Sequence, residues 1–191
     1  MHVSTERLEL RDVVMADVPA MHQFFGDRAL TQFTNFYRPS ESDTRRCIED
    51  WIFHNNQRPR FAHNSAMVSH AGDEVIGWIG FGHAYHKSIG ERSFGYALRR
   101  DEWNKGYMTE ALTAVLAYCF GELAVASVFG AHRPQNPASG RVMEKVGLRY
   151  VGTFPSSSEA GVIERRFIAF QEEWLLGRDL SSVRIGAEAN P

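Results

Sequence analysis

The sequence predicts one α/β domain built on a mixed, mostly antiparallel sheet. Strand-like alternation dominates the first and middle parts of the chain, whereas apolar residues at helical spacing return late, near 106–123 and 136–147. The 43% hydrophobic content supplies a core, and no internal repeat or linker divides the 191 residues. We therefore expect a single domain over 1–191, with its core at about 4–172 and a loose tail at 179–191.

The N-terminal part predicts a strand followed by two helices. Residues 6–14 alternate apolar and polar side chains, as a half-buried strand does. A helix then begins at 17–19 and runs to about Phe25, with a proline in its first turn. Either Ser40 or Ser42 can cap the next helix, near 41–57.

The remaining elements alternate between strands and helices. Three strands are predicted at 60–69, 74–83 and 91–99. From 106 to 123 the apolar residues follow one helical stripe. The last elements are a strand at 127–132, a helix from Asn136-Pro137 to Gly147, and strands near 148–154 and 162–171.

Composition excludes several classes of protein. The net charge is −2 and no dense basic run is present, so nucleic-acid binding is not expected. Membrane binding is not expected either, because no apolar run has the length of a membrane span and no signal peptide is recognisable. Cys47 and Cys119 fall in helical patterns, which predicts free thiols in a cytoplasmic protein. His83 and His86 lack a further ligand nearby, so no metal site is expected.

One loop stands out as a candidate anion site. Lys105 and Gly106 lie between the predicted strand at 91–99 and the helix that follows. A helix start offers unpaired amides and a positive dipole end, and glycine permits close backbone approach. The loop has neither the dinucleotide-binding nor the P-loop glycine pattern. Taken alone, it is equally compatible with an ordinary turn.

A second feature follows at 132–148, which reads HRPQNPASGRVMEKVGL. Here Asn136 can cap a helix and Ser139 lies in the first turn, while Val142, Met143 and Val146 are expected in the core. By itself this segment is an ordinary capped helix. This segment follows the candidate anion site after one intervening strand, and the two features together are more specific for a function than either one alone.

Together the two features resemble the GNAT superfamily of acetyl-CoA-dependent N-acetyltransferases. The opening TERLEL, the strand FGYAL, the helix start WNKGYMTEAL and the segment NPASGRVMEKVGL all resemble its ribosomal-protein N-acetyltransferase branch, over about residues 4–172. This resemblance implies an acyl-CoA N-acyltransferase fold with six to seven strands and about four helices. It also implies acetyl-CoA as cofactor, with coenzyme A as product.

By this resemblance, six consecutive residues match the family's phosphate-binding loop. These are Trp103, Asn104, Lys105, Gly106, Tyr107 and Met108. Trp103 stands where the family usually has Gln or Arg, and Met108 stands where it has a small residue. Backbone amides bind the pyrophosphate, so this function should survive both changes, with the Met108 side chain turned toward the core.

Other cofactor contacts follow from the same resemblance. The strand at Ala97, Leu98 and Arg99 should run beside the pantetheine arm, with the amide of Ala97 or Leu98 donating to the thioester carbonyl. Asn136 matches a family asparagine that contacts the arm, although capping competes with this contact. Arg141 either reaches the phosphate end or lies on a solvated helix face.

The catalytic groups are harder to assign. The family tyrosine that protonates the departing thiolate is replaced by Met143, so Ser139 is the candidate donor to sulfur. The family glutamate before the G-Y pair is replaced by serine. Glu91, two residues earlier on the same strand face, is therefore the first candidate base. His83 or His86, and then Tyr96, follow as weaker candidates.

The acceptor is an amine of unspecified kind. In this family the loop at 31–39 shapes the acceptor pocket, so Phe33, Phe36 and Tyr37 either line it or anchor the loop, and His83 is a further candidate. A protein N-terminus is the first hypothesis. A small-molecule or antibiotic acetyltransferase and a noncatalytic acyl-CoA-binding module remain alternatives, with a monomer or homodimer expected.

Overall fold

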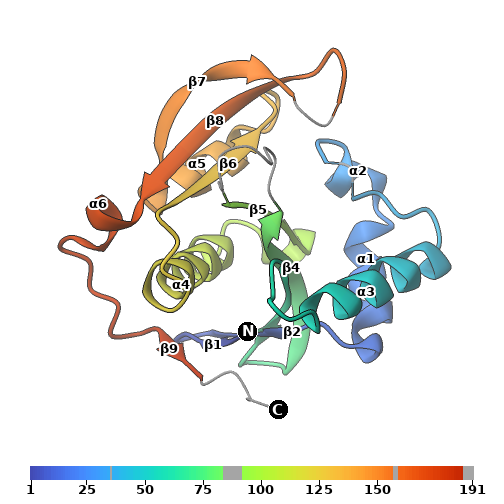
Figure 1. Cartoon of the computed structure of the whole chain (residues 1–191). Coiled ribbons are helices and arrows are strands. Elements are labelled where there is room, and N and C mark those ends of the chain that lie inside the picture. Colours follow the sequence, from blue (N-terminus) through green and yellow to red (C-terminus); the bar gives the residue numbers. More distant parts are fainter. Residues whose placement is uncertain (35, 84–91, 157–158, 187–191) are drawn as a thin grey trace.

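A computed structural model of the chain describes residues 1–34, 36–83, 92–156 and 159–186. Within these ranges the strands form one sheet in the order β7-β8-β6-β5-β4-β3-β2-β1-β9 (Figure 1). The strands are β1 His2–Ser4, β2 Leu8–Asp12, β3 His63–Ser69, β4 Glu74–His83, β5 Arg92–Leu98, β6 Ser127–His132, β7 Arg149–Pro155, β8 Ile163–Phe170 and β9 Arg184–Ile185. Neighbours pair antiparallel except β5 and β6, which are parallel. The predicted mixed, mostly antiparallel α/β sheet is confirmed.

Six α-helices accompany the sheet in the described part of the chain. They are α1 Val18–Phe25, α2 Arg28–Thr31, α3 Glu41–Asn55, α4 Tyr107–Gly121, α5 Pro137–Lys145 and α6 Gln171–Leu175. Of the two candidate caps for α3, Ser40 is the N-cap, and its hydroxyl accepts from the amide of Asp43 at 3.2 Å. The Asp43 carboxylate accepts in turn from the Ser40 amide at 3.1 Å, which completes a capping box.

The sheet separates two apolar clusters, and α1 and α3 lie on one side of it with α4 on the other (Figure 1). Strand β3 shows how the alternation works. Met67 faces the α4 cluster, whereas Ala66 and Val68 face the α1–α3 cluster. In the α1–α3 cluster Trp51 of α3 stacks on Trp78 of β4, with ring centroids 4.6 Å apart.

The structure contains short elements that the sequence did not predict. Strands β1 and β9 and helices α2 and α6 have two to five residues each, too few to show a period. Residues 184–185, expected in a loose tail, instead pair with Val3 and Ser4 of β1. The tail expectation is therefore wrong for these two residues, while 187–191 lie outside the described part of the chain.

Helix α4 is the central element of its layer. The sequence predicted one apolar stripe, but Ala114, Ala117 and Tyr118 are buried as well, so the helix is covered on most sides. The predicted stripe residue Leu123 lies beyond the end of the helix and is exposed. This burial holds α4, and therefore its N-terminus, in a fixed place relative to the sheet.

Neither cysteine forms a disulfide. Cys119 is buried in α4, and Cys47 of α3 is only half-buried. Among the described residues no group of three or more His, Cys, Asp or Glu side chains is placed to hold a metal ion. None of the helices within the described ranges is both long enough and apolar enough to span a membrane.

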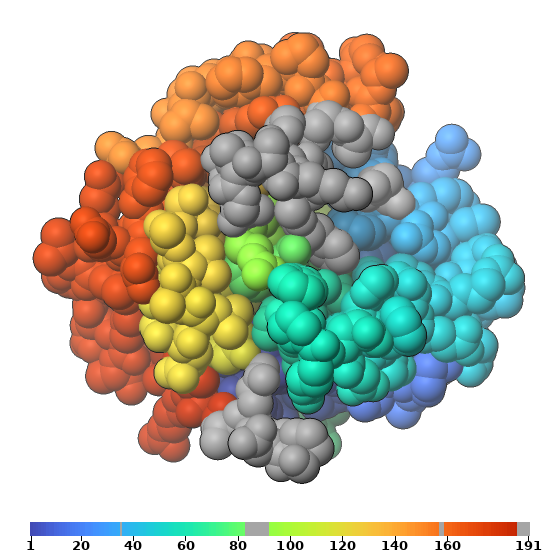
Figure 2. All heavy atoms as spheres, in the orientation of Figure 1, coloured from blue at the N-terminus to red at the C-terminus, as the bar shows by residue number. Residues whose placement is uncertain are grey.

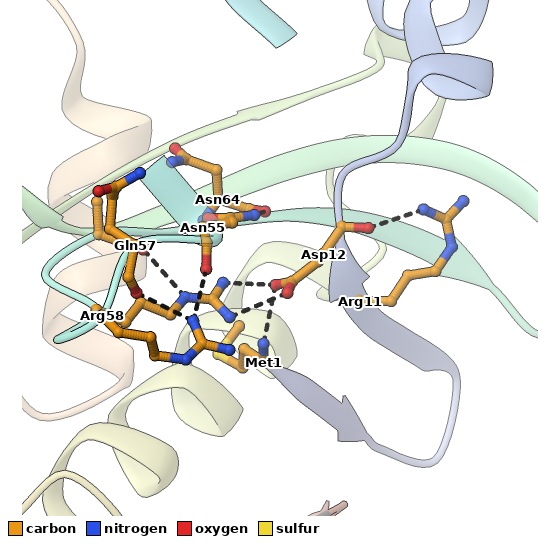
Figure 3. Close-up of polar contacts among 9 residues, drawn as sticks. Met1, Arg11, Asp12, Asn55, Gln57, Arg58 and Asn64 are labelled. Carbon is orange, nitrogen blue, oxygen red and sulfur yellow. Dashed lines mark hydrogen bonds and ion pairs between the residues drawn. The ribbon is translucent and has the colours of Figure 1, made fainter. Parts of the chain in front are cut away.

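Asp12, at the end of β2, joins the first residue of the chain to the segment before β3 (Figure 3). Its carboxylate accepts from the Met1 amino group at 2.8 Å and from the Arg60 guanidinium at 2.6 and 3.0 Å. Nearby, the side chain of Asn55 exchanges two 2.9 Å hydrogen bonds with the backbone of Asn64, which ties the end of α3 to β3. Partial burial opposes ionisation of Asp12, but the hydrogen bonds from Arg60 and the Met1 amino group outweigh it and lower the pKa of Asp12.

We expect Asp12→Asn to lower the free energy of unfolding by about 1–3 kcal/mol near neutral pH, because the Arg60 side chain is only 8% exposed and its charge-assisted hydrogen bonds to Asp12 would be weakened. The lowered pKa means that the stabilisation is complete above the unfolded pKa of about 3.9 and is lost as the pH falls through the folded pKa. Urea unfolding of both proteins from pH 3 to 7 should show the difference shrinking in acid. Asp50→Asn, at a solvated pair with His54, is the matched control and should change little.

Candidate active site

The sheet opens between β5 and β6. Their parallel pairing joins only Arg92 to Val128 and Ser93 to Phe129, although β5 continues to Leu98 and remains paired with β4 on its other side. Within the described part of the chain, the backbone of β5 after Ser93 therefore has one open edge. In the space-filling view, green atoms of the β5 region lie at the centre of this face, and the β7–β8 hairpin forms one outer end of the molecule (Figure 2).

The loop after β5 leads into a helix start without a side-chain cap. Gly106 is the N-cap of α4 in the left-handed conformation at φ 86°, and Asn104 is also left-handed at φ 61°. Helices α3 and α5, by contrast, are capped by the side chains of Ser40 and Asn136. The first amides of α4 therefore keep their hydrogen-bonding capacity for another group, which is the property of an anion site.

Charged side chains around this loop are largely paired within the protein. Lys105 donates to Glu102 at 3.0 Å. Arg99 contacts Glu74, Asp101 and Glu102 at 2.7–3.3 Å. The predicted positive charge of Lys105 is thus partly balanced, which leaves the amides and the helix dipole as the main attraction for an anion.

The two unusual loop residues have clear places in the structure. Trp103 donates its Nε1–H to the Leu98 carbonyl oxygen at 2.9 Å, so it fastens the loop to the end of β5. Met108 is 7% exposed and belongs to the α4 cluster, as its helical position predicted. Tyr107 packs against the same cluster.

Helix α5 begins across the opening from this loop and is held by Tyr96. The Asn136 side chain accepts from the Ser139 amide at 3.4 Å, which confirms the predicted cap. The Tyr96 hydroxyl lies 2.7 Å from the Ser139 hydroxyl and 3.2 Å from its carbonyl oxygen. Burial raises the pKa of Tyr96 well above its usual value, against a smaller opposing effect of the Ser139 hydrogen bond, so the phenol stays protonated.

His132, a residue that the sequence did not single out, supports α5 from β6. Its ring packs against Gly140, where an added Cβ would lie 2.7 Å from Nε2. Nδ1 lies 2.8 Å from the Arg133 carbonyl oxygen, and burial lowers the pKa of His132 and so favours the neutral ring. Tyr96 and His132 thus hold the first turn of α5 from the two separating strands.

The remaining predicted cofactor residues are placed as follows. Ala97 and Leu98 lie at the end of β5 and face opposite clusters. The Arg99 amide donates to the Ile76 carbonyl oxygen at 2.8 Å, so it continues the contact with β4. Arg141 is exposed on α5, two residues after Ser139. Ala97, Leu98 and Arg99 thus lie on the β5 side of the opening, and the exposed position of Arg141 is compatible with either predicted role.

Two of the four candidate bases, Glu91 and His86, lie outside the described residues. His83 ends β4, where its backbone pairs with Ser93 across a bulge. Tyr96 is already hydrogen-bonded to Ser139, and its raised pKa makes it a donor rather than a base.

The aromatic loop at 31–39 reaches β5 through Phe36. Its ring lies 4.8 Å from that of Trp78, and a Cβ at Gly95 would come within 3.3 Å of it. Phe36 therefore anchors the loop on the sheet face opposite Tyr96 and lies directly over β5. Tyr37 is exposed beside Arg28, with the guanidinium 5.7 Å from the ring, and Phe33 is half-buried.

Three further residues at the loop were not predicted from the sequence to belong to the site. Thr5, Arg7 and Glu110 form a hydrogen-bonded group between the β1–β2 turn and the first turn of α4. The pairs are more than 100 residues apart in the chain, with separations of 105 and 103. A glutamate in a first helical turn is ordinary in itself, so only the tertiary structure reveals the group.

The open strand edge, the uncapped glycine-led helix and the hydroxyl pair across the opening define an acyltransferase fold of the GNAT class. The family model of the acetyltransferase (GNAT) domain matches residues 7–149, three quarters of the chain. The chain belongs to this family and is an N-acetyltransferase.

Individual relatives agree with this assignment. The uncharacterized N-acetyltransferase YnaD of Bacillus subtilis (strain 168) is 28% identical over 179 residues, which is 91% of this chain and 99% of YnaD. A GNAT-family acetyltransferase structure from Bacillus anthracis has a TM-score of 0.76 at 27% identity and covers 90% of this chain and 99% of its own. RimJ of Mycobacterium smegmatis, in complex with CoA-disulfide, has a TM-score of 0.76 at 18% identity over 93% and 88% of the two chains, a likeness of fold.

Proposed function

We propose that this enzyme transfers the acetyl group of acetyl-CoA to the α-amine of a peptide or protein N-terminus, by direct attack in a ternary complex. The observation that carries the proposal is the uncapped start of α4 at Gly106, set beside the open edge of β5. Bound acetyl-CoA would supply an activated acyl group on a thiol leaving group. The protein binds the cofactor, donates a hydrogen bond to the leaving sulfur and assists deprotonation of the amine.

The residues present fit this cofactor. The free amides at the start of α4 suit a pyrophosphate, since nitrogen–hydrogen groups and the helix dipole both favour negative charge. The open edge of β5 at Ala97 and Leu98 suits an extended arm with amide groups, which would add to the sheet like a further strand. Of the two predicted amides, that of Leu98 would donate to the thioester carbonyl, because the Ala97 amide faces β4 like the Arg99 amide two residues later. The Leu98 carbonyl is already used by Trp103.

Ser139 is assigned the role of hydrogen-bond donor to the departing sulfur. The shorter of the two contacts of the Tyr96 hydroxyl is the one to the Ser139 hydroxyl, at 2.7 Å. If Tyr96 donates in this contact, the Ser139 hydrogen is free to point into the opening. Tyr96 then holds Ser139 in one rotamer and increases its strength as a donor, because hydrogen bonds in a chain polarise one another.

The amine must lose its proton before it attacks. About 10–20% of a peptide α-amine with pKa 7.7–8.0 is neutral at pH 7, compared with about 0.04% of a lysine amine. An N-terminal acceptor therefore needs little help from the protein, which suits a site where Tyr96 stays protonated. Glu91 remains the first candidate base, followed by His83 or His86, acting on the amine directly or through water.

The acceptor can be identified by measuring thiol release from acetyl-CoA with three matched sets of amines. We expect peptides with a free N-terminus to be acetylated, with kcat/KM rising toward a plateau above about pH 8 as the α-amine deprotonates. N-terminally blocked peptides that contain lysine should be poor acceptors. Preference for small diamines or aminoglycosides would instead support the small-molecule alternative. Tight acetyl-CoA binding without turnover on every set would support a binding module.

A further inference from the structure

We propose that Arg7 and Glu110 are positioning residues for the pyrophosphate end of the cofactor. They fix the peptide between Lys105 and Gly106 so that its N–H faces the anion. This inference rests on the function proposed above and adds residues from the opposite end of the chain to it. It assigns a purpose to the TER segment at residues 5–7, which the site described so far does not use.

Glu110, in the first turn of α4, is completely engaged by the β1–β2 turn. Its Oε1 accepts from the Thr5 hydroxyl at 2.6 Å and from the Arg7 amide at 2.9 Å. Its Oε2 accepts from Arg7 Nε at 2.7 Å and from a terminal nitrogen of the same guanidinium at 2.5 Å. Partial burial opposes ionisation, but these hydrogen bonds outweigh it and lower the pKa of Glu110. The carboxylate is therefore ionised and locked.

Arg7 also connects Glu110 to the loop before α4. Its remaining terminal nitrogen donates to the Lys105 carbonyl oxygen at 2.9 Å, and its guanidinium lies 4.6 Å from the centre of the Tyr107 ring. Carbonyl and N–H point in opposite directions across a planar trans peptide. By holding the Lys105 oxygen on one side, Arg7 directs the Gly106 N–H to the other side, toward the position assigned to the pyrophosphate.

The pairing also removes an electrostatic conflict. A free carboxylate in the first turn of α4 would stabilise the empty helix but would repel a bound pyrophosphate. Arg7 neutralises Glu110 and turns it toward the β1–β2 turn, while Arg7 itself remains 42% exposed beside Gly106. An unpaired Glu110 should therefore weaken pyrophosphate binding even where the fold is intact.

If Arg7 and Glu110 only stabilise the fold, their loss should affect every acetyl-donor substrate equally. If they position the pyrophosphate, only donors that carry a pyrophosphate should be affected, and this contrast provides the test. S-acetylpantetheine has the thioester and the arm of acetyl-CoA but lacks the pyrophosphate. For Arg7→Ala we expect kcat/KM with acetyl-CoA to fall about 10–30-fold, mainly through KM, and kcat/KM with S-acetylpantetheine to change less than about threefold. Arg149→Ala, which breaks the exposed pair with Glu173, is the matched control and should change neither value.

Two conservative variants keep the test valid if Arg7→Ala folds poorly. Arg7→Lys preserves the charge but cannot contact Glu110 and Lys105 together, so we expect only partial recovery of the acetyl-CoA value. Glu110→Gln removes the negative charge and keeps the shape, and should affect acetyl-CoA less than Arg7→Ala does. An equal loss with both donors, or no loss with either, would overturn the inference. Lack of acetyl-CoA turnover by the wild-type enzyme would instead refute the proposed function.

Discussion

Gly106→Glu is expected to weaken acetyl-CoA binding strongly, with the dissociation constant raised about 30–100-fold. The new carboxylate would stand at the N-cap of α4, beside the amides assigned to the pyrophosphate. Two like charges about 4 Å apart repel by roughly 4 kcal/mol at an effective dielectric constant of 20, and screening at this exposed loop leaves about 2–3 kcal/mol. Each 1.4 kcal/mol corresponds to a factor of ten in affinity. Calorimetric titration with acetyl-CoA measures the effect.

Gly177→Glu is the matched control for this substitution. Gly177 is also left-handed, at φ 72°, and nothing lies within 4 Å of an added Cβ. It lies after α6, outside the cofactor loop. Both variants therefore carry the same backbone strain and the same added charge, and only the loop variant should lose affinity. Unchanged binding by Gly106→Glu would remove the loop from the cofactor site.

Ser139→Ala is expected to lower kcat about 100-fold while leaving the dissociation constant of acetyl-CoA within about threefold of the wild-type value. A positioned proton or hydrogen-bond donor to the leaving group typically contributes 100-fold or more to a rate. Alanine removes only the hydroxyl, and the backbone amide of residue 139 can still be capped by Asn136. Single-turnover measurements with saturating acetyl-CoA separate the chemical step from product release.

A serine in the first turn of another helix controls for loss of a first-turn hydroxyl. Ser42 lies in the first turn of α3, and Ser42→Ala should leave kcat unchanged. Tyr96→Phe tests the hydroxyl chain further, because it removes the partner at 2.7 Å and leaves Ser139 free to rotate. Its effect should be smaller than that of Ser139→Ala and should vanish in the double variant. If kcat survives Ser139→Ala, the serine serves only to begin the helix.

Much of the fold was predictable because its main elements carry local signals. The stripe of α4, the Asn136-Pro137 start of α5 and the helix-ending Gly147 were each visible in the sequence. The sequence also marked Lys105-Gly106 as either an anion site or an ordinary turn, and the left-handed N-cap at Gly106 is what the structure adds. The two-residue strand β9 had no such signal, because a strand of that length exists only through its pairing with β1.

The contacts that complete the site depend on residues far apart in the sequence. Tyr96 meets Ser139 across 43 positions, and Arg7 meets Glu110 across 103 positions. Each of these side chains is unremarkable in its local segment, and only the sheet order brings the partners together. The sequence also suggested Phe36 either as a pocket residue or as an anchor. Its place over Gly95 shows that it anchors the loop on β5, and lining the acceptor pocket remains a prediction.

The opening between β5 and β6 has a consequence for aggregation. An unpaired strand edge is a template on which another polypeptide can add itself, and most sheets expose such edges only at their outer limits. Here two edges separate inside the sheet, and the first turn of α5 lies between them, held by Tyr96 and His132. Detachment of α5 would uncover both edges at once, so we expect loss of the cap at Asn136 to favour self-association of the chain.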